Sequence, residues 1–157
     1  MNVRRATSAD RDAIAAVVRA VYEEYGFTWD ESGYHADLAD VDSAYDAFWV
    51  ADDGGGVVGT AGLDLSDTRI GSLRDCDCSL ERLYVLARAR GRGAGSALMR
   101  AVVAEASATG RSSLAIWSDK RFADAHRLYE RLGARVVAER VHDDPDRSHE
   151  WGLVLHL

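Results

Sequence analysis

The chain has 157 residues, of which 47% are hydrophobic and 29% are charged, and its net charge is −7. This length buries the core of one domain without disulfides or metals, so we expect a single domain over residues 1–157. The acidic charge argues against a nucleic-acid backbone as partner, and no segment resembles a membrane span or a signal peptide. We therefore expect a cytoplasmic protein that binds neither nucleic acid nor membranes.

The N-terminal third predicts one helix among short strands. Residues 2–6 form a strand, and Thr7–Asp10 supply capping side chains for a helix that ends near Tyr22. Two further strands are predicted over residues 46–51 and 57–65, joined by a hairpin turn rich in glycine. Such a hairpin is typical of an antiparallel pair of strands.

The stretch between residues 23 and 45 interleaves aromatic and acidic side chains and contains one short helical piece near residues 34–39. One interpretation is a solvated acidic face whose rings turn inward. The other is a substrate-binding segment, in which Tyr25, Phe27 and Trp29 cover an apolar group while carboxylates attract a cationic amine. The residues alone leave both interpretations open.

A polar connection over residues 66–77 contains Cys76, and Cys78 follows it. A closed zinc site needs about four ligands, and neither the two cysteines nor the histidines of the chain have the required spacing. We therefore expect two reduced cysteines and no metal site.

The most informative segment begins at residue 80. Residues 80–86 predict a strand, the turn Arg90–Gly95 is basic and rich in glycine, and a helix begins near Ser96. The first N–H groups of a helix have no intrahelical acceptor, and the helix dipole favours an anion such as phosphate there. The alternative is a sharp surface turn without a ligand. The glycine spacing matches neither the P-loop nor the dinucleotide motif Gly-x-Gly-x-x-Gly.

Strict alternation along this strand predicts that Glu81 shares one face with Leu83 and Val85, while Arg82 lies on the other face. A carboxylate in line with two apolar residues is a candidate catalytic base. The alternative is a solvent-facing acid that pairs with Arg82 or Arg74.

The rest of the chain predicts a buried strand over residues 112–117, a helix capped by Asp119 and ended by Gly133, and two strands over residues 135–140 and 149–157. A strand, a crossover helix and a second strand of these lengths favour parallel pairing. The apolar stripe of the second helix consists of Phe122, Ala125, Leu128, Tyr129 and Leu132.

Two of these segments together resemble a known family. Arg90, Gly93 and Gly95 form Arg-x-x-Gly-x-Gly, which is similar to the pyrophosphate-binding motif of the GNAT superfamily, the Gcn5-related N-acetyltransferases. In that family the motif also follows a strand and opens a helix. Residues 124–134 resemble the family's alanine, leucine-tyrosine, glutamate and glycine pattern on the next helix. The likeness covers most of the chain from about Phe48 to the C-terminus.

The resemblance implies an α/β (α+β) fold with one GNAT-like domain. Such a domain has a mixed, mostly antiparallel central sheet of about seven strands, with a parallel central pair that splays apart and about four flanking helices. It also implies acetyl-CoA as co-substrate and no metal. The cofactor-binding residues implied in this way are Leu83, Tyr84, Val85, Arg90, Gly91, Arg92, Gly93, Ala94, Gly95, Ser96, Phe122, Ala125 and Tyr129.

By the same resemblance, Tyr129 corresponds to the general-acid tyrosine that protonates the departing CoA thiolate. Glu81 is our candidate base for the incoming amine, acting directly or through a water. Phe122 departs from the family pattern, because many members have an asparagine there. The candidate substrate-binding residues are Tyr25, Phe27, Trp29 and Trp117.

These features predict an N-acetyltransferase that transfers an acetyl group to a primary amine of a small molecule or peptide by direct attack in a ternary complex. The alternative is a non-catalytic acyl-CoA-binding sensor or interaction module. A nucleotide-binding doubly wound fold is disfavoured by the glycine spacing and by the antiparallel hairpin. The last strand can complete the sheet of its own chain or that of a second copy, so a homodimer is possible.

Overall fold

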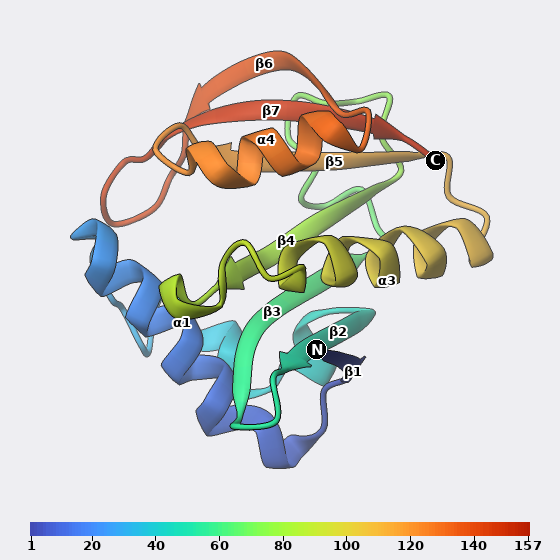
Figure 1. Cartoon of the computed structure of the whole chain (residues 1–157). Helices are drawn as coiled ribbons and strands as arrows, with labels where there is room; N and C mark the ends of the chain where they lie inside the picture. Colours follow the sequence, from blue (N-terminus) through green and yellow to red (C-terminus); the bar gives the residue numbers. More distant parts are fainter. The chain divides into compact units, whose positions relative to one another are not determined.

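A computed structural model describes residues 1–157 and shows a mixed α/β protein (Figure 1). The strands are β1 (Asn2–Arg5), β2 (Ala47–Asp52), β3 (Val57–Asp64), β4 (Cys78–Val85), β5 (Ser113–Asp119), β6 (Arg135–Val141) and β7 (His149–His156). The helices are α1 (Arg11–Tyr25), α2 (Val41–Ala44), α3 (Ala94–Ala108) and α4 (Ala123–Arg131). Three short 3-10 turns accompany them: η1 (Ser8–Asp10), η2 (Ala36–Ala39) and η3 (Ala87–Ala89).

The seven strands form one mixed sheet in the order β1-β2-β3-β4-β5-β7-β6. β4 and β5 are parallel, with Cys78 opposite Leu114 and Leu80 opposite Ile116. β1 pairs with β2, and β7 pairs with both β5 and β6, in the antiparallel sense. The expected mixed seven-stranded sheet with a parallel central pair and four helices is therefore confirmed.

The chain forms two compact units, and each is assembled from two separate stretches. The first unit comprises residues 1–62 and 82–101, and the second comprises residues 63–81 and 102–157. The division therefore falls inside β4 and inside α3. No helix is both long and apolar enough to cross a membrane.

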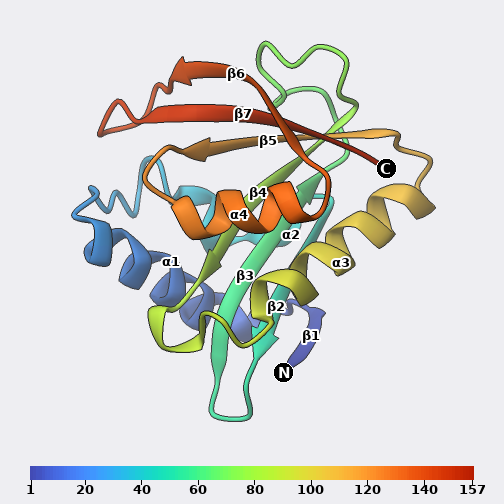
Figure 2. The same cartoon turned by 45° about the horizontal axis from the view of Figure 1, so that its top comes forward.

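Helix α1 supplies much of the core of the first unit. Its buried residues Ile14, Val17, Val18 and Val21 follow the helical spacing that the sequence predicts. The helix continues beyond the expected end at Tyr22 for three more residues, and Gly26 ends it in the left-handed conformation, with φ 71°. In the same unit the glycine-rich turn between β2 and β3 closes a hairpin, as predicted (Figure 2).

The second unit contains a small core under the connection between β3 and β4. Ile70, Leu73 and Cys76 of this connection are buried together with Ala115 of β5. A connection that we expected to be merely polar therefore contributes to the core. Helix α4 lies beside β5 and β7 in both views (Figures 1 and 2).

Helix α4 starts and ends differently from the prediction. Phe122, and not Asp119, occupies its N-cap position, and no side chain caps the helix there. The Asp119 carboxylate instead accepts hydrogen bonds from the backbone and guanidinium of Arg121. Leu132 is 40% exposed, because it lies beyond the last helical residue and no longer follows the buried stripe. Gly133 ends the segment with φ 100°, as predicted.

Asp10 holds the start of α1 in place through its carboxylate. Its replacement by asparagine is expected to lower the free energy of unfolding at pH 7 by about 1 kcal/mol, the usual cost of a lost helix cap. The carboxylate accepts the N–H of Thr7 at 2.8 Å and two guanidinium N–H groups of Arg4 at 2.8 and 2.9 Å. The hydrogen bonds from Arg4 are the main cause that lowers the pKa of Asp10 from 3.8 to about 2.

A carboxyl group whose pKa is lowered by folding contributes stability above its unfolded pKa and loses this contribution as the pH falls through the folded value. The stability difference between the native protein and Asp10→Asn should therefore shrink as the pH falls from about 4 to about 2. Urea unfolding of both proteins at neutral pH and near pH 2 measures this difference in stability. A difference that does not change with pH would contradict this role of the carboxylate.

Candidate active site

The glycine turn after β4 has a backbone that only glycine adopts readily. Gly91 and Gly93 have φ angles of 72° and 88°, and both are exposed. A β-carbon added at either residue would meet no atom within 4 Å, so the space beside the turn is open. Helix α3 begins directly after it, at Ala94, and its first N–H groups have no intrahelical acceptor. The turn can therefore bind an anion through backbone donors.

The arginines of the turn are already paired. Arg90 donates from Nε to the Val85 carbonyl at 3.0 Å, and its two terminal nitrogens donate to the Glu24 carboxylate at 2.6 and 2.7 Å. These hydrogen bonds from Arg90 hold the pKa of Glu24 below its ordinary value. Arg92 lies 3.9 Å from the Asp53 carboxylate, which also pairs with Arg88 of η3 at 2.8 Å. The Arg90 side chain thus fixes the end of β4 to the end of α1, and the backbone of the turn remains for a phosphate.

β4 departs from the alternation that its sequence predicts. Arg82 has φ 51°, a left-handed conformation that is uncommon for a residue with a side chain. The strict assignment of faces, with Glu81, Leu83 and Val85 on one side, is therefore wrong, because a residue outside the β region interrupts the pleat. Leu83, Tyr84 and Val85 follow this irregularity and are all half-buried.

The aromatic residues of the segment after α1 pack mainly on one another. Phe27 is 9% exposed and lies edge-on to Tyr22, with ring centroids 5.5 Å apart. Trp29 stacks on His35 at 4.3 Å. Tyr25 and Trp29 remain half-buried. The interpretation of rings turned inward describes Phe27 well, while Tyr25 and Trp29 keep part of their surface accessible.

His35 lies in the middle of this aromatic group and is 2% exposed. Its Nδ1 accepts the N–H of Asp30 at 3.1 Å, so the proton of the neutral ring is on Nε2, which is buried without a hydrogen-bond partner. Burial, and secondarily the positive charge of Arg82, lower the pKa of His35 to about 4. The ring is therefore neutral at pH 7.

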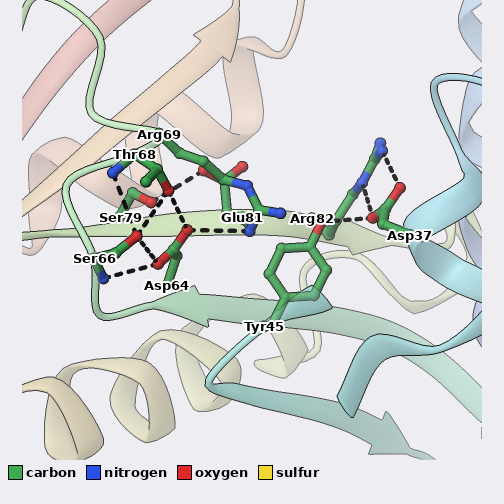
Figure 3. Close-up of polar contacts among 9 residues, drawn as sticks. All are labelled: Asp37, Tyr45, Asp64, Ser66, Thr68, Arg69, Ser79, Glu81 and Arg82. Carbon is green, nitrogen blue, oxygen red and sulfur yellow. Dashed lines mark hydrogen bonds and ion pairs between the residues drawn. The ribbon is translucent and has the colours of Figure 1, made fainter. Parts of the chain in front are cut away.

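In the second unit, Glu81 is half-buried and accepts a hydrogen bond from the Ser79 hydroxyl at 3.1 Å (Figure 3). Asp64 lies in the same close-up, and its carboxylate binds the hydroxyls of Ser66 and Thr68 and the guanidinium of Arg69. Of the two arginines considered as alternative partners of Glu81, Arg82 binds Asp37 through its guanidinium. The geometry leaves Glu81 as a partly accessible carboxylate.

Helix α4 places Tyr129 inside the second unit, where it is 3% exposed. Ala125 and Phe122, on the same helix segment, are half-buried. One turn before Tyr129, His126 shares a hydrogen bond between its Nε2 and the Ser118 hydroxyl at 3.0 Å. Burial lowers the pKa of His126, so this ring favours its neutral form. The side chains of α4 are thus ordered by packing and by a contact to β5.

The side chain of Trp117 is held by contacts within the protein. Its indole N–H donates to the Ile70 carbonyl at 2.8 Å, and the Arg140 guanidinium lies 4.2 Å from a ring centroid. A β-carbon at Gly152 would lie only 2.7 Å from the ring, so this glycine is required by close packing. A contact of Trp117 with substrate stays a prediction.

The profile of the Acetyltransferase (GNAT) family matches residues 14–134. The chain belongs to the GNAT acetyltransferase family. It is 33% identical over 138 residues to the uncharacterized N-acetyltransferase YjgM of Escherichia coli K12, a match that covers 83% of this chain and 80% of YjgM. It is also 32% identical over 117 residues to human N-acetylaspartate synthetase, a match that covers 71% of this chain but only 37% of that enzyme.

The GNAT fold is also found in solved structures. The crystal structure of yncA, a putative acetyltransferase from Salmonella typhimurium with its cofactor acetyl-CoA, superposes with a TM-score of 0.77 at 23% identity. The superposition covers 100% of this chain and 94% of that protein. The expected family, fold class and acetyltransferase activity are therefore confirmed, with acetyl-CoA as the acyl donor of the family.

Sequence reasoning located the two GNAT motifs but missed the side chains that tie them to the rest of the protein. Glu24 and Asp37 were seen only as members of an acidic stretch, yet each forms an ion pair with an arginine far along the chain. His126 is held by Ser118 of β5, a partner that its neighbours in the chain do not indicate. No local signal identifies these partners. The one indication is that an arginine in a mostly apolar strand needs an acidic partner if it is buried.

Proposed function

We propose that this GNAT protein is an N-acetyltransferase that transfers the acetyl group of acetyl-CoA to a primary amine of a small molecule or a peptide. The observation that carries the proposal is the turn with Gly91 and Gly93 in the left-handed conformation. This turn follows the central strand β4 and the short η3, and it opens α3. A backbone of this form is suited to a pyrophosphate, because it presents N–H donors with no β-carbon in the way. We propose that residues 1–157 act as one catalytic domain.

The residues present fit acetyl-CoA, which supplies a thioester activated toward an amine. The backbone N–H groups of Gly91 to Ser96 would bind the pyrophosphate, with Ala94 at the first position of α3. Leu83 and Tyr84 would pair through their backbone with the pantetheine arm, and the N–H of Val85 would stabilise the charge that develops on the thioester oxygen. The splayed arrangement of the central strands stays part of this proposal.

The proton transfers are assigned to two side chains of the second unit. An amine of the lysine type has a pKa near ~10.4, so it must lose a proton before it attacks, and Glu81 accepts that proton directly or through a water. Tyr129 donates its hydroxyl proton to the departing thiolate of CoA. The hydroxyl of Ser79 donates a hydrogen bond to the Glu81 carboxylate and helps to fix its orientation.

Direct attack in a ternary complex is supported by the state of the cysteines. A covalent acyl-cysteine route would need an accessible thiolate. Cys78 is fully buried, and burial is the main cause that raises its pKa to about 12. Cys76 is 4% exposed, and burial raises its pKa as well. Both thiols are therefore poor nucleophiles at neutral pH.

The acceptor amine is proposed at the level of its class. The sequence suggested a cationic acceptor attracted by the acids of residues 23–45, but Glu24 and Asp37 of this stretch are neutralised by arginines. The name of the human relative points to an amino acid that carries extra negative charge. An acceptor panel should therefore contain polyamines, lysine peptides, N-terminal peptides and α-amino acids including aspartate. The homodimer and the cytoplasmic location stay predictions.

The test is the release of free CoA thiol from acetyl-CoA in the presence of each amine. We expect turnover with at least one amine, a KM on the order of 1 μM to 1 mM, and binding of acetyl-CoA by calorimetry without binding of NADH or ATP. Tight binding of acetyl-CoA without turnover of any amine would instead support an acyl-CoA sensor. No binding at all would overturn the assignment of the glycine turn.

A further inference from the structure

Arg82 interrupts the central strand in a way that local sequence does not require. Its φ of 51° takes the backbone out of the β region between Glu81 and Leu83. The carbonyl of Arg82 accepts the hydroxyl of Thr60 on β3 at 2.7 Å, so a side chain satisfies it. Residues with a β-carbon persist in such a conformation only where the surroundings enforce it, and such sites concentrate at functional positions.

The Arg82 side chain supplies the enforcing contacts. Its Nε and Nη2 donate to the two carboxylate oxygens of Asp37 at 3.0 and 2.8 Å, and Nη2 also donates to the carbonyl of Tyr34 at 2.7 Å. The hydroxyl of Tyr45 donates to the same carboxylate at 2.5 Å (Figure 3). The side chains of Arg82 and Asp37 are only 8% and 16% exposed.

This ion pair is well matched despite its burial. The planar guanidinium binds the carboxylate in bidentate fashion and uses a second N–H of Nη2 on a backbone carbonyl, an arrangement that lysine cannot reproduce. Burial is the largest single influence on Asp37 and raises its pKa. The hydrogen bonds and positive charge of Arg82, together with the hydrogen bond from Tyr45, outweigh burial and hold the pKa below its ordinary value. Removing one partner would leave the other charged and buried without compensation.

We infer that the Arg82–Asp37 ion pair is a positioning device, which fixes residues 28–44, the part of the candidate substrate-binding stretch that follows Phe27, to the strand that binds the acyl donor. The inference rests on the proposed function, because it takes Leu83 to Val85 as the donor-binding part of β4. The pair joins η2, in the middle of that segment, to the residue immediately before Leu83. Arg82 and Asp37 are positioning residues, and neither needs to touch the reacting atoms.

The expected consequence is a loss of alignment between amine and thioester. A displacement of about 1 Å between reacting groups can cost about 10²-fold in rate. The strand and the glycine turn retain their own contacts, including those of Arg90, when the pair is broken. The variants should therefore lose kcat and raise the KM for the amine, while they bind acetyl-CoA as before.

The experiment uses Arg82→Lys and Asp37→Asn, each alone and combined, in the full chain. Each single variant should lower kcat at least about tenfold, raise the KM for the amine, and change the acetyl-CoA affinity less than about twofold. The combined variant should lose little more than either single one, since both break the same interaction. Lys120→Ala, which removes the more exposed pair with Glu139 in the second unit, should leave kcat unchanged.

Amide hydrogen exchange gives a readout that does not depend on activity. Residues 28–44 should exchange faster in Arg82→Lys and Asp37→Asn than in the native protein and in Lys120→Ala, while α3 remains protected. An unchanged kcat in folded variants, unchanged exchange across residues 28–44, or a rate loss that follows lost acetyl-CoA binding would each overturn the inference. If the native protein itself acetylates no amine, the proposed function fails, and the exchange data still decide whether the pair anchors the segment.

Discussion

Tyr129→Phe is expected to lower kcat by about 10²-fold, which corresponds to about 2.7 kcal/mol of lost transition-state stabilisation. The substitution removes the one group of this side chain that can donate a proton to the CoA thiolate and keeps the ring that packs inside the second unit, where Tyr129 is 3% exposed. Because the ring is retained, acetyl-CoA affinity and thermal stability should change little. Steady-state release of CoA thiol, together with calorimetric titration of acetyl-CoA, measures both effects.

A matched control for this substitution is Tyr22→Phe. Tyr22 is also buried, at 6% exposure, and its hydroxyl lies 3.4 Å from that of Tyr84. Removing this hydroxyl should cost some stability without a comparable loss of kcat. If Tyr129→Phe turns over at the native rate, the phenol is not the acid. If Tyr22→Phe loses as much rate as Tyr129→Phe, the loss comes from removing a buried hydroxyl and not from removing a proton donor.

Gly93→Ala is expected to weaken acetyl-CoA binding about tenfold, because the residue adopts φ 88° at the start of α3. A β-carbon costs roughly 1 to 2 kcal/mol in the left-handed region, and the turn relieves this strain by shifting the N–H groups that we assign to the pyrophosphate. A shift of this size is equivalent to about 5- to 30-fold in affinity. Calorimetric titration with acetyl-CoA measures it, with thermal unfolding recorded in parallel.

Gly110→Ala separates the loss of the binding site from simple backbone strain. Gly110 follows the other end of α3 with φ 82°, and a β-carbon there also meets nothing within 4 Å. The two substitutions should therefore cost similar stability, and only Gly93→Ala should weaken acetyl-CoA binding. Equal affinities in the two variants would mean that the turn does not contact the cofactor, and the mechanism built on it would have to be abandoned.

Local patterns were sufficient for most secondary structure. The spacing of Ile14, Val17 and Val21 identified α1, and the glycine turns at Gly54 and Gly133 marked where elements end. These features depend on the chemistry of neighbouring residues, since amphipathic periodicity and left-handed glycines act within a few positions of the chain. The two GNAT motifs were visible for the same reason, because each is one short segment whose backbone form follows from its own residues.

The errors occurred where distant segments meet. The last turn of α1 is fastened by Arg90, which lies 66 positions after Glu24 in the chain. The guanidinium of Arg82 binds Asp37, 45 positions earlier in the chain, and not the neighbouring Glu81. In both cases a charged side chain binds a partner that local propensity cannot predict, because the pairing depends on which groups the fold brings within about 3 Å.

The residues alone were sufficient to assign this chain to an acetyltransferase family. They also identified its glycine turn, its candidate acid Tyr129 and the periodicity of its helices. The backbone of Arg82 and the ion pairs of Asp37 and Glu24 were decided by tertiary structure. A left-handed residue within a strand, like a buried ion pair, is unfavourable in isolation and persists only where several groups from separate elements compensate it together. That compensation exists only after the first unit has folded, so no short stretch of sequence carries it.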